Sequence, residues 1–147
     1  MITCRLAVCA ERVLLDQNTN SMSLISVMDE VAAPALPMFL SSLSCVFLLT
    51  RESTDDSVIE FTLTAGVIGQ ERQKFPVSVD FQGKNLTRSM VTLAGVVIMQ
   101  PGIFRAEIAL RDSTDSALGY WDIAVNVQGS APAAVQILPP TSIQVAG

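Results

Sequence analysis

Hydrophobic and polar side chains alternate along most of this chain with the two-residue period of a half-buried β-strand. The clearest example follows a Pro-Gly turn at residues 101–102, where Phe104, Ala106 and Ile108 point one way and charged side chains point the other. A polar turn comes next, and residues 118–127 then alternate again. These two stretches predict a pair of antiparallel strands.

Further stretches with the same pattern are predicted to be strands, at residues 3–10, 12–15, 22–28, 39–50, 58–67, 74–82 and 86–99. The polar residues 16–21 suit a hairpin loop, because Asn and Asp tolerate left-handed backbone. Residues 29–38 contain Pro34 and Pro37, which are too close together for a stable helix. We therefore expect a crossover loop there.

Three positions predict finer features of the strands. Residues 39–50 are apolar on both faces, which indicates a central strand or a strand under a cover. Pro76 cannot donate to a ladder, so residues 74–82 are predicted to be an edge strand. The apolar run that follows Gly95 indicates a bulge.

About eight strands at this spacing, with no helical period, predict an all-β fold, an antiparallel two-sheet sandwich of immunoglobulin-like or C2-like type. A closed barrel is the alternative. A chain of 147 residues is expected to form one domain. We assign residues 1–128 to the sandwich domain and residues 129–147 to a C-terminal arm or tail.

The C-terminal segment differs in composition from the rest, being rich in Ala, Pro and Ser and free of charge. Val135 and Ile137 form one short alternating piece, and Ile143 and Val145 form another. The segment is either a disordered tail or an arm that adds to an open sheet edge, its own or a neighbour's. Deletion of residues 129–147 is then expected to leave the sandwich folded and to change its oligomeric state.

Composition narrows the classes of partner. Apolar residues make up 50% of the chain and charged residues 16%, so either the core is large or a partner covers apolar surface. The net charge of −5, without a basic cluster, argues against nucleic acid and against a bare anionic membrane. Glu11 and Arg12 interrupt the first apolar run, so we expect no secretion signal and a cytoplasmic location.

The three cysteines, Cys4, Cys9 and Cys45, have no metal-binding spacing. Cys4 and Cys9 are five residues apart, so on one straight strand they face opposite sides. Either of them could approach Cys45 across a sandwich. We expect buried free thiols, since free Cys packs as a small hydrophobe.

Little in the chain speaks for chemistry. There is no histidine, which removes Ser-His and Cys-His nucleophile pairs and His-based zinc sites. No phosphate-binding glycine motif occurs. We therefore predict no enzyme and no cofactor.

Acidic residues at predicted strand ends and turns offer one weak metal site. Loops cluster at the two ends of a sandwich, where carboxylates from several loops can bind Ca²⁺. The candidates are Asp16, Asp55, Asp56, Asp112 and Asp115. The simpler interpretation, which we favour, is that Asp is a good turn residue.

Tyr120 and Trp121 are adjacent on one predicted strand and so face opposite sides. Trp121 is predicted to be in the core. Tyr120, with Leu118, is a candidate for an interface because aromatic side chains are enriched there.

Two parts of the chain resemble a family of short bacterial β-sandwich proteins of unknown function. The resemblance rests on an R-V-x-x-D run and an S-L-I-x-V strand within residues 10–16 and 22–27, on the prolines 34 and 37, and on residues 93–95 and 101–104. It covers residues 3–127 in outline, and residues 128–147 lie outside the pattern. It implies a sandwich fold and no known activity, so no functional residue is carried over.

The function expected from the sequence is a non-enzymatic protein-interaction or assembly module. It would bind a protein partner or itself, as a homo-oligomer, through sheet edges, loops or the C-terminal arm. One alternative is a structural protein of a phage particle, located in the virion. The other is a C2-like sandwich that binds Ca²⁺ or lipid through the loop aspartates.

Overall fold

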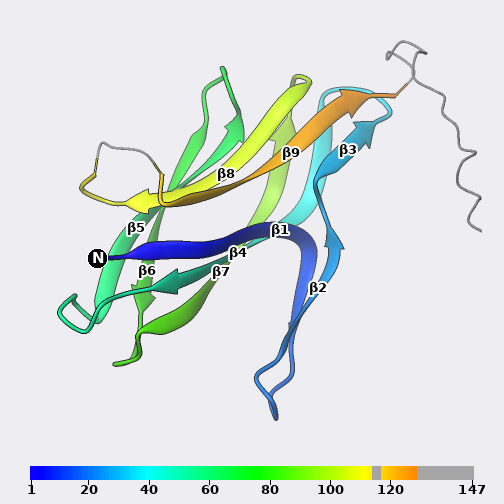
Figure 1. Ribbon diagram of the computed structural model, residues 1–147. Coiled ribbons are helices and arrows are strands. Elements are labelled where there is room, and N and C mark those ends of the chain that lie inside the picture. The colour runs from blue at the N-terminus through cyan, green and yellow to red at the C-terminus, as the bar shows by residue number, and fades with distance from the viewer. Residues whose placement is uncertain (114–116, 129–147) are drawn as a thin grey trace, which may run out of the picture.

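The computed structural model describes residues 1–113 and 117–128 (Figure 1). These residues form nine strands and no helix. The strands are β1 (Thr3–Leu15), β2 (Met22–Val27), β3 (Glu30–Ala33), β4 (Met38–Thr50), β5 (Val58–Val67), β6 (Gln73–Asp80), β7 (Leu86–Ile98), β8 (Gly102–Leu110) and β9 (Gly119–Val127).

The strands form two sheets that share one core, a sandwich-like arrangement. The four-stranded sheet has the order β2-β1-β4-β7, and the five-stranded sheet has the order β3-β9-β8-β5-β6. The core takes side chains from both sheets, among them Leu43, Phe47 and Leu49 of β4, Phe61 and Leu63 of β5, Ile108 of β8 and Ile123 of β9. The predicted all-β, two-sheet fold is confirmed, and most neighbouring strands are antiparallel.

The predicted crossover loop at residues 29–38 is wrong in its first half. Residues 30–33 form β3, which pairs in parallel with β9, from Glu30 opposite Ala124 to Ala33 opposite Val127. Just before it, the Trp121 indole N–H donates to the Met28 carbonyl at 2.5 Å. Pro34 excludes a helix but lies after this strand, so the prolines restrict only the connection to β4.

The apolar strand at residues 39–50 is central, as predicted. It corresponds to β4, which lies between β1 and β7. Its outward-facing Val46 is fully buried, and its neighbour Val8 on β1 is buried. The reason is that β1 bends strongly (Figure 1) and its second half pairs only with β2. Arg88 of β7 donates to the Asn20 carbonyl in the loop of that hairpin at 2.8 Å, so the hairpin covers this face.

The predicted bulge after Gly95 is not found. β4 and β7 keep one register from Met38 opposite Ile98 to Thr50 opposite Leu86. Gly95 instead takes a positive φ of 72° within that register, which glycine allows without an inserted residue. The irregularity lies in β1, where the register with β4 shifts between Cys4 and Leu6.

The sandwich has two distinct ends. At one, which we call the tail end, β3, β5, β7 and β9 finish and β4, β6 and β8 begin, as the registers require. At the other, the loop end, lie the N-terminus, the connection of residues 51–57 and the turn of residues 81–85. In Figure 1 the tail end lies toward the top and the N-terminus toward the left.

Candidate functional site: an apolar groove between two sheet edges

A groove of about 840 Å³ lies between the two sheets. Its walls are the first half of β6 and the second half of β7, and the end of β5 closes its back. β6 is the edge of the five-stranded sheet and β7 the edge of the four-stranded sheet. The predicted edge position of Pro76, on β6, is thereby confirmed.

The floor of the groove is the uncovered side of the core. Leu93 of β7 and Phe104 of β8 are buried there. Around them Phe75, Val77 and Val91 are only half-buried and still pack against the core. These apolar side chains, which another part of a protein would normally cover, therefore border open space.

The rim of the groove is polar and almost uncharged. Gln70, Gln73, Gln100 and Thr92 contribute amide and hydroxyl groups. Among the described residues that line the groove, Glu71 alone carries a charge. An uncharged ligand with apolar side chains and a polar backbone suits such a lining.

The groove lies in the tail-end half of the sandwich. At the loop end the turn of residues 81–85 joins β6 to β7, and the buried ring of Phe81 fills the space between the sheets. The strand residues that line the groove come from the tail-end parts of β5, β6, β7 and β8.

Exposed apolar side chains surround the tail end. Phe39 and Val97 face each other across β4 and β7 and are 65% and 54% exposed, and Met99 is 63% exposed. Ile68 and Ile103 are also exposed, and the Ile68 backbone N–H donates to the Ile103 carbonyl at 2.8 Å. Part of the apolar excess of the composition is thus exposed at the tail end.

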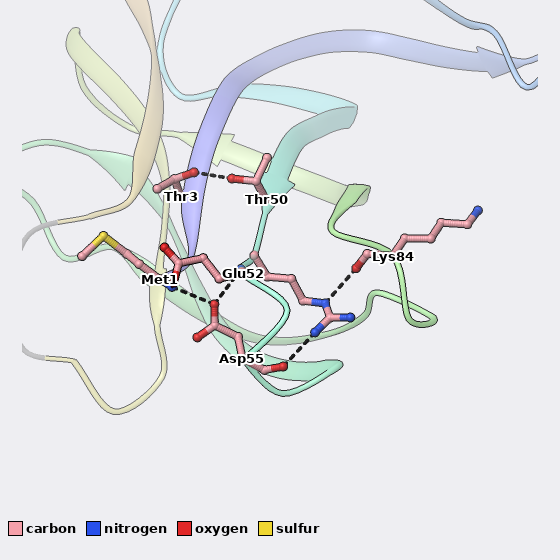
Figure 2. A network of polar contacts seen from close by, with 7 residues as sticks. Met1, Thr3, Thr50, Glu52, Asp55 and Lys84 are labelled. Atoms are coloured by element: carbon pink, nitrogen blue, oxygen red, sulfur yellow. Dashed lines mark hydrogen bonds and ion pairs between the residues drawn. The ribbon is translucent and has the colours of Figure 1, made fainter.

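The loop end carries a polar network instead (Figure 2). The Met1 ammonium donates to the Asp55 carboxylate at 2.8 Å and lies 3.1 Å from the Glu52 carboxylate. Arg51 donates to the Lys84 carbonyl at 2.7 Å and to the Asp55 carbonyl at 2.7 Å. The hydrogen bond from Met1 lowers the pKa of Asp55 and raises the pKa of the ammonium. These groups hold one another and fasten the 51–57 loop to the next turn.

The structure does not bring the candidate metal ligands together. Asp16 accepts the backbone N–H groups of Asn18 and Thr19 at the hairpin loop, and Asp55 belongs to the network at the loop end. Asp56 and Asp112 are exposed, and Asp115 lies outside the described residues. Within the described ranges no three acidic or thiol side chains gather as a metal site would need.

The candidate interface residues fall in different places. Tyr120 is 53% exposed on the outer face of β9, where the Arg105 guanidinium lies 4.0 Å from its ring centre. Arg105 also holds Asp122 through two hydrogen bonds of 2.7 and 2.9 Å, which raises the pKa of Arg105. Leu118 packs against the core instead. The other four candidates, Val135, Ile137, Ile143 and Val145, lie outside the described residues.

The three thiols are free. Cys9 and Cys45 face each other within one sheet, on β1 and β4, with their sulfur atoms 3.4 Å apart, and both are fully buried. The expected buried free thiols are thus confirmed for Cys9 and Cys45, which approach each other within one sheet and not across the sandwich. The expectation that Cys4 and Cys9 face opposite sides is wrong, because the register shift after Cys4 lets both pack on the core.

Sequence reasoning missed the groove. The one sequence signal related to it was Pro76, which predicted an edge strand. No family model matches the chain, and no curated protein matches it either. The described part of the chain contains no helix that could cross a membrane.

Proposed function

We propose that this protein is a non-enzymatic protein-interaction module whose groove receives an extended segment of a protein partner. The observation that carries the proposal is the groove itself, which is apolar and lies between two sheet edges that have no second neighbour among the described residues. An extended peptide can add to such an edge through backbone hydrogen bonds while its alternate side chains enter apolar pockets.

β7 is the edge that offers the better ladder. Pro76 lies in the middle of β6 and cannot donate a hydrogen bond, which blunts that edge. The groove-lining part of β7 contains no proline. A bound strand would extend the four-stranded sheet and turn its apolar side chains toward Leu93 and Phe104.

The sandwich type proposed with this function is immunoglobulin-like rather than C2-like. The neighbours β1-β4-β7 follow the A-B-E order of one immunoglobulin sheet, and β9-β8-β5 follow the G-F-C order of the other. The proposed location remains the cytoplasm, with which three free thiols are compatible.

The test uses a fluorescein-labelled, capped octapeptide in which Ser alternates with Val and Ile, and it measures fluorescence anisotropy with the full chain. We expect saturable binding that Val97→Glu weakens at least tenfold, about 1.4 kcal/mol. Val97 lines the groove and is 54% exposed, so the carboxylate does not have to be buried for the protein to fold.

Val58→Glu is the matched control, since Val58 is 51% exposed on β5 at the loop end. It should bind the peptide like the unaltered chain. Absence of binding, or equal loss in both variants, would exclude the groove as the binding site.

A further inference from the structure

The last described strand ends at the same end of the sandwich as the groove. β9 finishes at the tail end, where the Gln128 backbone N–H donates to the Ala33 carbonyl at 2.7 Å. The residues that line the groove belong to that same end. The chain that follows residue 128 therefore starts at the end of the sandwich where the groove lies, on the far side of β8 and β5.

The distance to the groove is short. From β9, the five-stranded sheet continues through β8 and β5 to β6, which is three strand spacings. At about 4.8 Å per spacing this is about 14 Å. Residues 129–132, fully extended, span about 13 Å, so residue 133 can reach the tail-end half of β6, which forms one wall of the groove.

The segment that arrives there matches the groove in chemistry and length. Residues 133–138 read Ala-Ala-Val-Gln-Ile-Leu, and no residue from 129 to 147 is charged. As a strand these six residues span about 20 Å, and the seven groove-lining residues of β7, 91–97, span about 23 Å. Pro132 and Pro139 bracket the segment and limit the ladder to this stretch.

The direction also fits. A segment that enters at the tail end runs toward the loop end, whereas β7 runs the opposite way. The added strand is therefore antiparallel to β7, which is the more favourable pairing. Val135 and Ile137 then share the face that turns toward the floor.

We propose that residues 133–138 occupy the groove of their own chain as a strand antiparallel to β7, and that a partner strand binds by displacing them. Displacement by a partner strand rests on the proposed function, whereas occupation of the groove by the chain's own residues does not. Own-chain binding is favoured over a neighbour's groove because a linker that just spans the gap gives an effective concentration in the millimolar range.

The first experiment follows amide hydrogen exchange of residues 91–97 in the full chain by mass spectrometry. Val135→Asp/Ile137→Asp should speed exchange there at least tenfold, because charges cannot enter the apolar floor. Ser142→Asp/Gln144→Asp adds the same charges to the same tail and should change nothing. Equal exchange in the unaltered chain and both variants would overturn the inference.

The second experiment measures binding of the octapeptide to the same three proteins. Val135→Asp/Ile137→Asp should bind it at least tenfold more tightly, since the competitor has gone, and the control variant should bind as the unaltered chain does. Unchanged affinity would overturn the displacement while the groove remained a binding site. Faster exchange without any peptide binding would instead retain the tail in the groove and reject the proposed function.

Light scattering distinguishes a groove occupied by the chain's own tail from a groove occupied by the tail of a second copy. The unaltered chain should have the mass of a monomer. A dimer that dissociates in Val135→Asp/Ile137→Asp would overturn own-chain binding and place each tail in the groove of a second copy.

Discussion

Asp55 illustrates how a residue with an ordinary local role acquires a distant partner. Its carboxylate accepts the Glu52 backbone N–H at 2.8 Å, as a turn aspartate does. It also accepts a hydrogen bond from the Met1 ammonium, 54 residues away in sequence. That second bond lowers the pKa of Asp55 below its usual 3.8 and raises the pKa of the ammonium above its usual 8.0.

These two shifts predict a pH window for Asp55→Asn. The lowered pKa of Asp55 contributes stability above pH 3.8, which is lost as the pH falls through the folded-state pKa. The raised pKa of the ammonium contributes stability below pH 8.0, which is lost as the pH rises through its folded-state pKa. Asn keeps an acceptor for Glu52 and removes only the charge.

The melting temperatures of the unaltered chain and of Asp55→Asn should therefore differ most between pH 3.8 and pH 8.0. They should converge at lower and at higher pH. The difference should be small, because the pair is exposed, and should shrink in 1 M salt. A constant difference from pH 3 to pH 10 would mean that the ion pair does not contribute.

At the scale of elements, the two sheets touch along one side and separate along the other. On the closed side β1 and β9 come so close that a Cβ at Gly119 would lie 2.5 Å from the Cys4 sulfur. On the other side β6 and β7 leave the groove between them. The sandwich is thus a wedge, with small residues at its closed side and apolar walls at its open side.

Gly119→Ala should wedge β1 and β9 apart. Overpacking of this kind costs about 1–3 kcal/mol, and chemical denaturation should report a loss of that size. The cost should fall by at least half in a Cys4→Gly background, because that change removes the clashing Cβ and sulfur atoms. An equal cost in both backgrounds would show that the contact with Cys4 is not its origin.

At the scale of the whole molecule, the reactivity of the Cys9 and Cys45 thiols shows whether the core is closed. Both thiols are fully buried between the sheets, whereas Cys4 is half-buried. The hydrogen bond with Cys45, together with burial, raises the pKa of Cys9, and burial raises the pKa of Cys4. Since the thiolate is the reactive form, native-state alkylation of the buried pair requires the sandwich to open.

Iodoacetamide labelling followed by peptide mass spectrometry should therefore modify Cys9 and Cys45 together, at a rate that rises with denaturant as global unfolding does. Cys4 should react at least tenfold faster in native buffer, because its sulfur is nearer the surface. Labelling of Cys9 at the rate of Cys4 would contradict a closed core.

The sequence by itself determined most of the strands and the direction of most side chains. Phe104, Ala106 and Ile108 were expected to share one face of their strand, and all three lie in the core, because the pleat of a strand sends alternate residues to opposite faces. Pro76 identified an edge because a missing N–H excludes a central position in any sheet. These inferences need only neighbouring residues, so no tertiary information was required.

The tertiary structure alone decided which edges became neighbours. The groove depends on β6 and β7, which end different sheets, and the short β3 forms only because β9 lies beside it. The side that Cys4 faces was decided by a shift in its register with β4. Pairing between distant strands sets all of these features, and alternation within one strand carries no information about its partner.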